Sequence, residues 1–146
     1  MKKFISKPHL FFFGLVPLFI ILGLIKKDAL MDVNISYVYF ELAISTLCYL
    51  SAIFFSLIGL NYFSVLLSGK KLKKGLTITH IILQLIAFIP FIYLIISINN
   101  DGNISSDSKS LVEKLVLFLF IGFFFFLLSI LIHLINFFSS LFLKTK

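Results

Sequence analysis

The amino-acid sequence predicts an all-α membrane protein with four transmembrane helices and both ends of the chain on the cytoplasmic side. Of the 146 residues, 60% are hydrophobic and only 13% are charged, whereas about a quarter of the residues in soluble domains are charged. The apolar residues are gathered in four long runs, and a spanning helix needs roughly 20 such residues. Lysines flank these runs unevenly, which gives them an orientation.

The four apolar runs define the spans. The first extends from His9 to Ile25, between Lys7 and Lys26. Its basic start and apolar middle resemble a signal peptide, but no small-residue cleavage site follows, so we interpret it as an uncleaved span. The later runs extend from Val38 to Leu67, from Leu76 to Ile98 and from Leu111 to Leu143. The largest connecting segment, Asn99 to Ser110, is too short for a soluble domain, so residues 1–146 are expected to form one four-helix domain.

The lysines predict which side of the membrane each connection occupies. Nine lie on one side, at Lys2, Lys3, Lys7, Lys70, Lys71, Lys73, Lys74, Lys144 and Lys146. Cytoplasmic segments carry an excess of basic residues, so we expect both termini in the cytoplasm, at a bacterial inner membrane. The other side carries four lysines and five of the six acidic residues. The bases sit in short clusters without arginine, unlike a nucleic-acid-binding face, so no nucleic-acid partner is expected.

The sequence lacks the residue patterns of common active sites. No nucleophile-base pair, phosphate-binding loop or pair of redox cysteines is apparent, and Cys48 is the single cysteine. We therefore expect no enzyme activity from the chain alone, and no cofactor.

Short segments spread over the chain carry a family resemblance. The stretch from Lys7 to Gly14, continuing to Leu24, comes first, and Ile78 to Leu83 follows the lysine-rich loop. Between them lie seven matching positions, Asp32, Val33, Tyr39, Phe40, Ala43, Phe55 and Gly59. The first stretch resembles the ninth helix of haem-copper (cytochrome c) oxidase subunit I. The seven positions resemble its tenth helix and the segment entering it, and Ile78 to Leu83 resembles the start of its eleventh helix. The resemblance implies that the fourth span corresponds to the twelfth helix, and that the segment before the second span lies outside.

The resemblance also implies that the family's chemistry is missing. Where the tenth helix of subunit I supplies two histidine ligands to the haems, this chain has Ile44 and Thr46, which cannot bind haem iron as histidine does. The family's His-Asp pair near an external metal site corresponds to Ser36 and Tyr37. The chain therefore resembles a short, degenerate form of the subunit.

Polar residues inside the spans are candidate functional residues because desolvating them is costly. They are Glu41, Gln84, Ser129, His133 and Asn136. For Glu41, near the start of the second span, we favour an interfacial carboxylate that reaches water or a lysine such as Lys26 or Lys27, over a proton or cation site. The residues of the fourth span lie on one stripe, which must face protein or water.

Three histidines, His9, His80 and His133, lie at a similar depth in the cytoplasmic half of the predicted spans. Together they could form a metal or haem site. No two of them share a helix at ligand spacing, so we favour hydrogen bonding between helices, with Thr77, Gln84 or Asn136 as partners.

Small residues predict a packing face on the second span. They are Ser45, Ala52, Ser56 and Gly59, and such residues let helices approach closely. We expect a noncatalytic membrane protein that uses this face to contact itself or a larger membrane complex. An oligomeric ion or proton channel, or a small transporter, is the first alternative, and a haem-binding membrane protein is the second.

Overall fold

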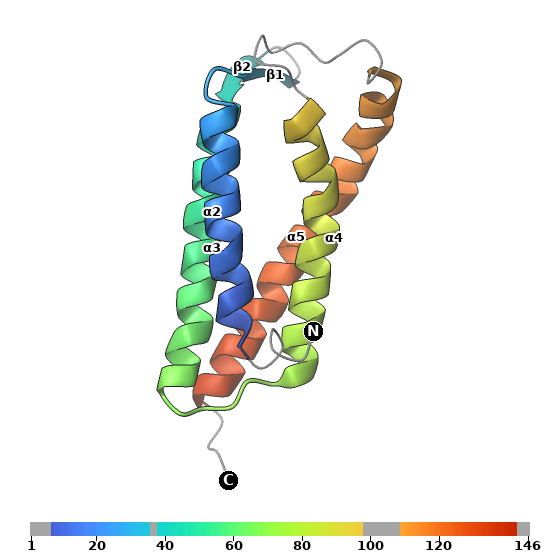
Figure 1. The fold of residues 1–146 in the computed structure, drawn as a ribbon. Coiled ribbons are helices and arrows are strands. Elements are labelled where there is room, and N and C mark those ends of the chain that lie inside the picture. The colour runs from blue at the N-terminus through green and yellow to red at the C-terminus, as the bar shows by residue number, and fades with distance from the viewer. Residues whose placement is uncertain (1–6, 36–37, 98–108, 143–146) are drawn as a thin grey trace.

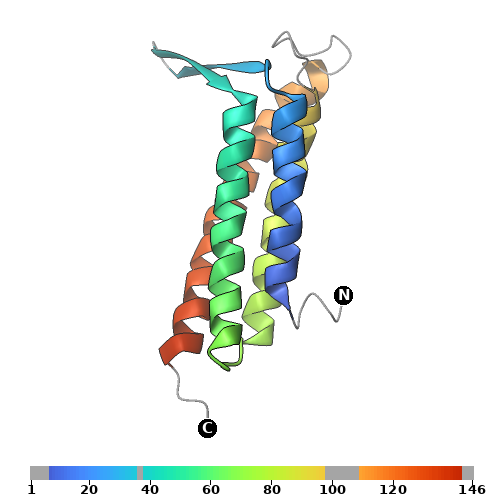
Figure 2. The same ribbon diagram turned by 60° about the vertical axis from the view of Figure 1, so that its left-hand side comes forward.

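A computed structural model describes residues 7–35, 38–97 and 109–142 of the chain (Figure 1). Four helices form a bundle, and a two-stranded hairpin connects the first two of them. The elements are α2 (Pro8–Ile25), β1 (Leu30–Ile35), β2 (Val38–Ala43), α3 (Ile44–Leu67), α4 (Lys74–Ser97) and α5 (Lys109–Phe142). The start of α2, the α3–α4 connection and the end of α5 lie at one end of the bundle, here called the lysine end. The opposite end is called the hairpin end (Figure 2).

All four helices are long and apolar enough to cross a membrane, as the sequence predicts. The spanning parts are Pro8–Ile25, Ile44–Leu67, Lys74–Ser97 and Phe120–Phe142, with mean hydropathies from 1.9 to 2.3. Large apolar side chains face outward, including Leu24, Ile89 and Phe120, which are 61%, 70% and 75% exposed. Such a surface suits hydrocarbon and not water, so the chain fits an integral membrane protein. Which end faces the cytoplasm stays a prediction from the lysines.

The prediction that the second span begins at Val38 is wrong, because residues 38–43 form a strand. β1 pairs with β2 in antiparallel register, from Leu30 opposite Ala43 to Ile35 opposite Val38. The sequence of β1 alternates apolar and polar residues, the period that a strand requires. Helix α3 begins only at Ile44, whose backbone N–H donates to the carbonyl of Ala29 at 3.0 Å and closes the base of the hairpin.

Glycines allow α2 and α3 to pack closely along their length. A Cβ atom at Gly59 would lie 2.6 Å from the ring of Phe13, and one at Gly23 would lie 2.7 Å from the ring of Tyr49. The predicted small-residue face of α3 is therefore used inside the chain. Ala52 and Gly59 are buried, and Ser45 and Ser56 are half-buried. Ala52 and Gly59 are thus covered within the chain, and contact of a partner with Ser45 or Ser56 stays a prediction.

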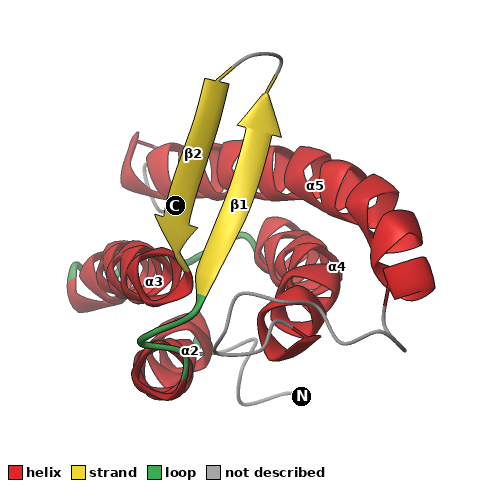
Figure 3. Ribbon diagram, turned by 90° about the horizontal axis from the view of Figure 1, so that it is seen from above, coloured by secondary structure: helices red, strands yellow, loops and turns green. Residues whose placement is uncertain are grey.

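The helices form two pairs, because α2 packs mainly on α3 and α4 packs mainly on α5 (Figure 3). Aromatic rings join the pairs near the middle of the bundle. Phe55 of α3 meets Phe88 of α4 edge to face with ring centroids 4.7 Å apart, and Phe19 of α2 lies 5.3 Å from Phe55 and 5.5 Å from Phe88. Offset and edge-to-face aromatic pairs are favourable arrangements. The two pairs therefore have a shared aromatic core.

Several predictions fall outside the described residues. These concern Ser36 and Tyr37, the predicted external loop at 99–108, and Lys2, Lys3, Lys144 and Lys146.

A buried polar cluster and an apolar cavity

Polar side chains of three helices converge in the half of the bundle at the lysine end. We call this group the buried polar cluster. It consists of Asn61 and Tyr62 of α3, Thr77, His80 and Gln84 of α4, and Ser129, His133 and Asn136 of α5. Seven of these eight side chains are buried inside the bundle, and that of Asn61 is half-buried.

The spacing of these residues explains why they meet. Residues three or four positions apart lie on the same face of a helix. Thr77, His80 and Gln84 therefore form one stripe on α4, and the residues of α5 follow at Ser129, His133, Asn136 and Ser140. Because α4 and α5 are antiparallel neighbours, the two stripes face each other. The predicted stripe on the fourth span thus faces protein.

Two histidines and a tyrosine lie at the centre of the cluster. The ring centroids of His80 and His133 are 4.9 Å apart, with the planes tilted by 31°. The hydroxyl of Tyr62 forms a 2.8 Å hydrogen bond with Nδ1 of His80. Phe12 of α2 stacks on the ring of His80, with the two ring centroids 4.9 Å apart. All four helices therefore contribute to the surroundings of this pair.

His133 is oriented by an amide of α3. Nδ2 of Asn61 donates to Nε2 of His133 over 3.4 Å. With the amide in this orientation its nitrogen donates, so the geometry favours the tautomer of a neutral His133 ring that has its proton on Nδ1.

Two further hydrogen-bonded groups join α4 to α5. The hydroxyl of Ser129 donates to Oε1 of Gln84 at 2.8 Å. Nδ2 of Asn136 donates to Oγ1 of Thr77 at 2.9 Å, and Oδ1 of Asn136 accepts from the backbone N–H of Lys73 at 3.2 Å. At the lysine end, Nζ of Lys70 donates to the carbonyl of Leu141. Thr77, Gln84 and Asn136 thus make interhelical bonds, but their partners are not the histidines.

Three polar atoms within the cluster have no hydrogen-bond partner among the described residues. They are Nε2 of His80, Nδ1 of His133 and Nε2 of Gln84. Nearly all buried polar groups in proteins are hydrogen bonded. These atoms are therefore the polar groups of the cluster that the described side chains leave without a hydrogen bond.

The third histidine does not join the other two. His9 of α2 is half-buried against Phe13 and Phe63, with centroid distances of 6.2 and 5.5 Å. Over residues 7–35, 38–97 and 109–142, no group of three His, Cys, Asp or Glu side chains could hold a metal ion.

Haem does not fit between the two converging histidines. Axial histidines hold the iron of a haem between their nitrogens, one on each side of the porphyrin, whereas the rings of His80 and His133 lie directly against each other with centroids 4.9 Å apart. The porphyrin plane has no room there, so we derive no haem chemistry from this pair.

Glu41 lies outside the four helices that are long and apolar enough to cross a membrane. It lies on β2, opposite Asp32 in the register, and its side chain is exposed. The costly feature that made it a candidate, a carboxylate inside a span, is therefore absent at this position. Lys27 forms a 3.8 Å ion pair with Asp28.

Two members of the cluster, Asn61 and Tyr62, are not among the residues predicted from the sequence. Asn61 carries the same signal that selected Gln84 and Asn136, a carboxamide within an apolar helix. Tyr62 has no such signal, because a tyrosine in a span also suits an interface.

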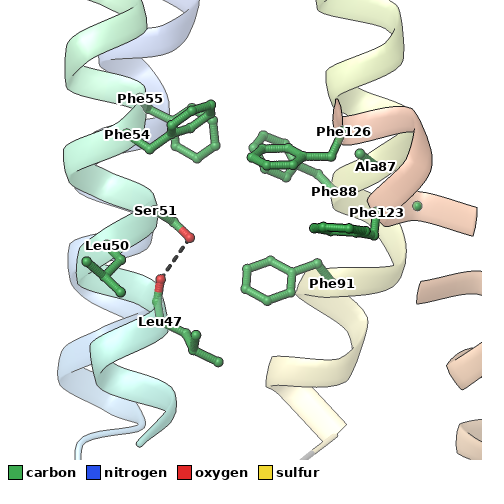
Figure 4. Close-up of a pocket in the computed structure, with 11 residues that line it drawn as sticks. Leu47, Leu50, Ser51, Phe54, Phe55, Ala87, Phe88, Phe91, Phe123 and Phe126 are labelled. Carbon is green, nitrogen blue, oxygen red and sulfur yellow. Dashed lines mark hydrogen bonds between the residues drawn. The ribbon is translucent and has the colours of Figure 1, made fainter. Parts of the chain in front are cut away.

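An apolar cavity occupies the other half of the bundle, between α3 and the α4–α5 pair (Figure 4). Its volume is about 480 Å³. The wall on α3 comes from Leu47, Leu50, Ser51, Phe54 and Phe55, and the opposite wall from Ala87, Phe88, Phe91, Gly122, Phe123 and Phe126. The hydroxyl of Ser51 donates to the carbonyl of Leu47 at 2.8 Å, so the single side-chain hydroxyl among the lining residues is already paired.

Comparison with known proteins gives no relative from which a function could be transferred. No family model, curated protein or solved structure matches the chain. The resemblance to oxidase subunit I therefore stays a prediction from the residues.

Proposed function

We propose that this chain is a noncatalytic integral membrane protein that acts as a structural or accessory component of a membrane complex. In this proposal it is similar to a short, degenerate form of the C-terminal region of haem-copper oxidase subunit I. It lies in a bacterial inner membrane with both termini in the cytoplasm. Four apolar helices and the lysine-rich α3–α4 connection support this placement.

The observation that carries the proposal is how the polar side chains are used. Tyr62 bonds to His80, Ser129 to Gln84 and Asn136 to Thr77, in each case between two helices. In a bilayer such bonds hold helices together, since apolar side chains gain little by leaving lipid for protein. The cluster therefore stabilises the packing of the helices through hydrogen bonds between them. The apolar outer faces are left for contact with neighbouring molecules.

In this proposal the surface that meets a partner lies elsewhere than on the small-residue face of α3, because Gly59 of that face packs on Phe13 of α2. The outward faces of α4 and α5 are better placed. They carry exposed residues such as Ile89, Phe120 and Phe124. Contact there would bury large apolar side chains without breaking the cluster.

A proton or ion path is the second candidate function, favoured by the three unpartnered polar atoms of His80, His133 and Gln84. Such a path would run within one copy of the chain. The stripe on α5 contacts α3 and α4, which favours a path within one copy over a pore between copies.

Purification of the full-length chain in mild detergent tests the leading proposal. We expect it to elute as a complex larger than one chain. This complex is either an oligomer with a fixed number of copies or an assembly with one companion protein in a fixed ratio. A matched pair of variants locates the contact: Ile89→Ala on the outward face of α4 should weaken the complex, and Leu50→Ala on α3 should not. A strictly monomeric protein in both detergent and lipid nanodiscs would contradict the proposal.

Proton flux into proteoliposomes tests the second candidate. The accessory role predicts no flux above that of protein-free liposomes loaded with a pH-sensitive dye. Flux that disappears in His133→Leu and persists in Ile135→Leu would replace the accessory role with a proton path.

A further inference from the structure

The apolar cavity opens sideways toward the surroundings of the bundle. Leu50 on α3 and Phe123 on α5 both line it, yet they are 57% and 58% exposed. These two residues therefore lie at the mouth of the cavity. Because both belong to helices that can cross a membrane, the mouth opens to the bilayer.

The chemistry of the lining selects a hydrocarbon ligand. All lining side chains other than that of Ser51 are apolar, or are glycine, and the hydroxyl of Ser51 is held by the carbonyl of Leu47. Pockets for polar small molecules contain a few placed polar groups that fix the ligand's orientation. A ligand with hydrogen-bonding groups would lose its bonds to water here and gain none.

The length of the cavity matches one leaflet of a bilayer. On α3 it extends from Leu47, near the start of the helix, to Phe55. The eight steps from Leu47 to Phe55 cover about 12 Å along the axis, at a rise of ~1.5 Å per residue. One leaflet contributes about 15 Å to the hydrocarbon core, half of its ~30 Å thickness. The cavity therefore begins near the hairpin end and stops close to the midplane.

Aromatic contacts close the cavity at its deep end (Figure 4). Phe54 meets Phe126 with centroids 5.2 Å apart, and Phe55 meets Phe88 at 4.7 Å. Beyond them the polar cluster joins the same helices. A spanning helix of a second copy or another protein is about 10–12 Å wide and would have to continue past this barrier. An acyl chain can end at it.

We propose that the cavity is a binding site for one acyl chain of a bilayer phospholipid, which enters from the leaflet at the hairpin end. The volume of about 480 Å³ is in the range of ~300–1,000 Å³ found for ligand pockets. The site is independent of the accessory role, because it requires only that the four helices lie in a bilayer.

The absence of tryptophan from the sequence allows a direct test with single-tryptophan variants of the full chain. Phe126→Trp places the probe in the cavity wall. Phe124→Trp, on the outer surface, reports full lipid contact, and Phe12→Trp, buried beside His80, reports protein surroundings. Each variant is reconstituted into phosphatidylcholine vesicles with or without bromine atoms midway along one acyl chain, which quench tryptophan on contact.

The acyl-chain site predicts that brominated lipid lowers the fluorescence of Phe126→Trp at least twofold, close to the loss in Phe124→Trp. Phe12→Trp should lose little. Adding Ser51→Leu, which narrows the cavity, should reduce quenching of Phe126→Trp and leave Phe124→Trp unchanged. Quenching of Phe126→Trp no greater than that of Phe12→Trp would overturn the proposal. So would quenching that appears only when the protein is diluted into excess lipid, since a second copy would then fill the cavity.

Discussion

The two halves of this bundle are held together in different ways. At the lysine end, α3, α4 and α5 are joined by hydrogen bonds such as Tyr62 to His80 and Asn136 to Thr77. At the hairpin end the same helices face each other across an apolar cavity. Apolar residues are plentiful in both halves, but among the described residues the hydrogen bonds between side chains of different helices lie in the first half. At the hairpin end, Nζ of Lys26 donates to the backbone carbonyl of Ile96 over 3.4 Å.

The difference follows from the solvent. In water, apolar surface drives helices together. In a bilayer, lipid tails are as apolar as the side chains, and association depends on close packing and hydrogen bonds. Close packing through Gly23 and Gly59 joins α2 to α3, and the polar cluster joins α3 to the α4–α5 pair. Where neither is present, the helices separate and lipid can enter.

The largest expected effect comes from overfilling the tight α2–α3 contact. Gly59→Leu should destabilise the fold by about 3 kcal/mol, because a side chain at this position meets the ring of Phe13 and overpacking costs roughly 1–3 kcal/mol. Unfolding in mixed detergent micelles measures the change.

Gly14→Leu is the matched control. Apart from its chain neighbours and the backbone of its own helix, no described atom lies within 4 Å of a Cβ atom built at Gly14, so this variant should be as stable as the parent or slightly more stable. Equal losses at both glycines would show that close packing does not join α2 to α3.

A smaller effect should separate the two halves directly. Asn136→Leu removes the hydrogen bonds to Thr77 and to the backbone N–H of Lys73. Because one hydrogen bond between membrane helices contributes ~0.6–1.7 kcal/mol, this variant should lose about 1–2 kcal/mol of unfolding free energy. Ser51→Ala in the cavity wall should cost close to nothing, because its hydroxyl bonds within its own helix. The same unfolding assay compares them. If Ser51→Ala lowers the free energy of unfolding as much as Asn136→Leu does, the polar cluster does not contribute specially to helix packing.

The smallest effect concerns the proton on His133. Nitrogen NMR of histidine-labelled protein in lipid should show a neutral ring protonated on Nδ1, because Nδ2 of Asn61 donates to Nε2. Asn61→Leu should give a mixture of both tautomers and a stability loss of only about 0.6 kcal/mol. Finding Nε2 protonated in the parent protein would contradict the geometry at this position.

Hydropathy predicts much of the fold and fails at one point. α2, α4 and α5 begin and end within two residues of the runs at 9–25, 76–98 and 111–143. The second run fails at its start, since Val38, Tyr39 and Phe40 are apolar whether they continue a helix or form a strand. The deciding feature is the pairing of β2 with β1, which the composition of one segment does not contain.

The site is only partly predictable for a related reason. Spacing alone places Ser129, His133 and Asn136 on one stripe. Their partners depend on which helices are neighbours and how each is rotated. The structure brings His80 to His133 and keeps His9 apart, although the sequence gives all three the same depth. Likewise, the small residues of α3 predict close packing but not that α2 is the neighbour.

Distance measurements between spin labels in lipid test the contrast between the two halves most directly. In a Cys48→Ala background, which removes the single cysteine, one pair of labels at Ser68 and Phe142 spans α3 and α5 at the lysine end. A second pair at Leu50 and Phe123 spans them at the mouth of the cavity. We expect a narrow distance distribution for the first pair, which broadens in Asn136→Leu, and a broader one for the second. A narrower distance distribution for the pair at the cavity, or no change for the first pair in Asn136→Leu, would contradict this account. The account requires helices held by hydrogen bonds at the lysine end and open to lipid at the hairpin end.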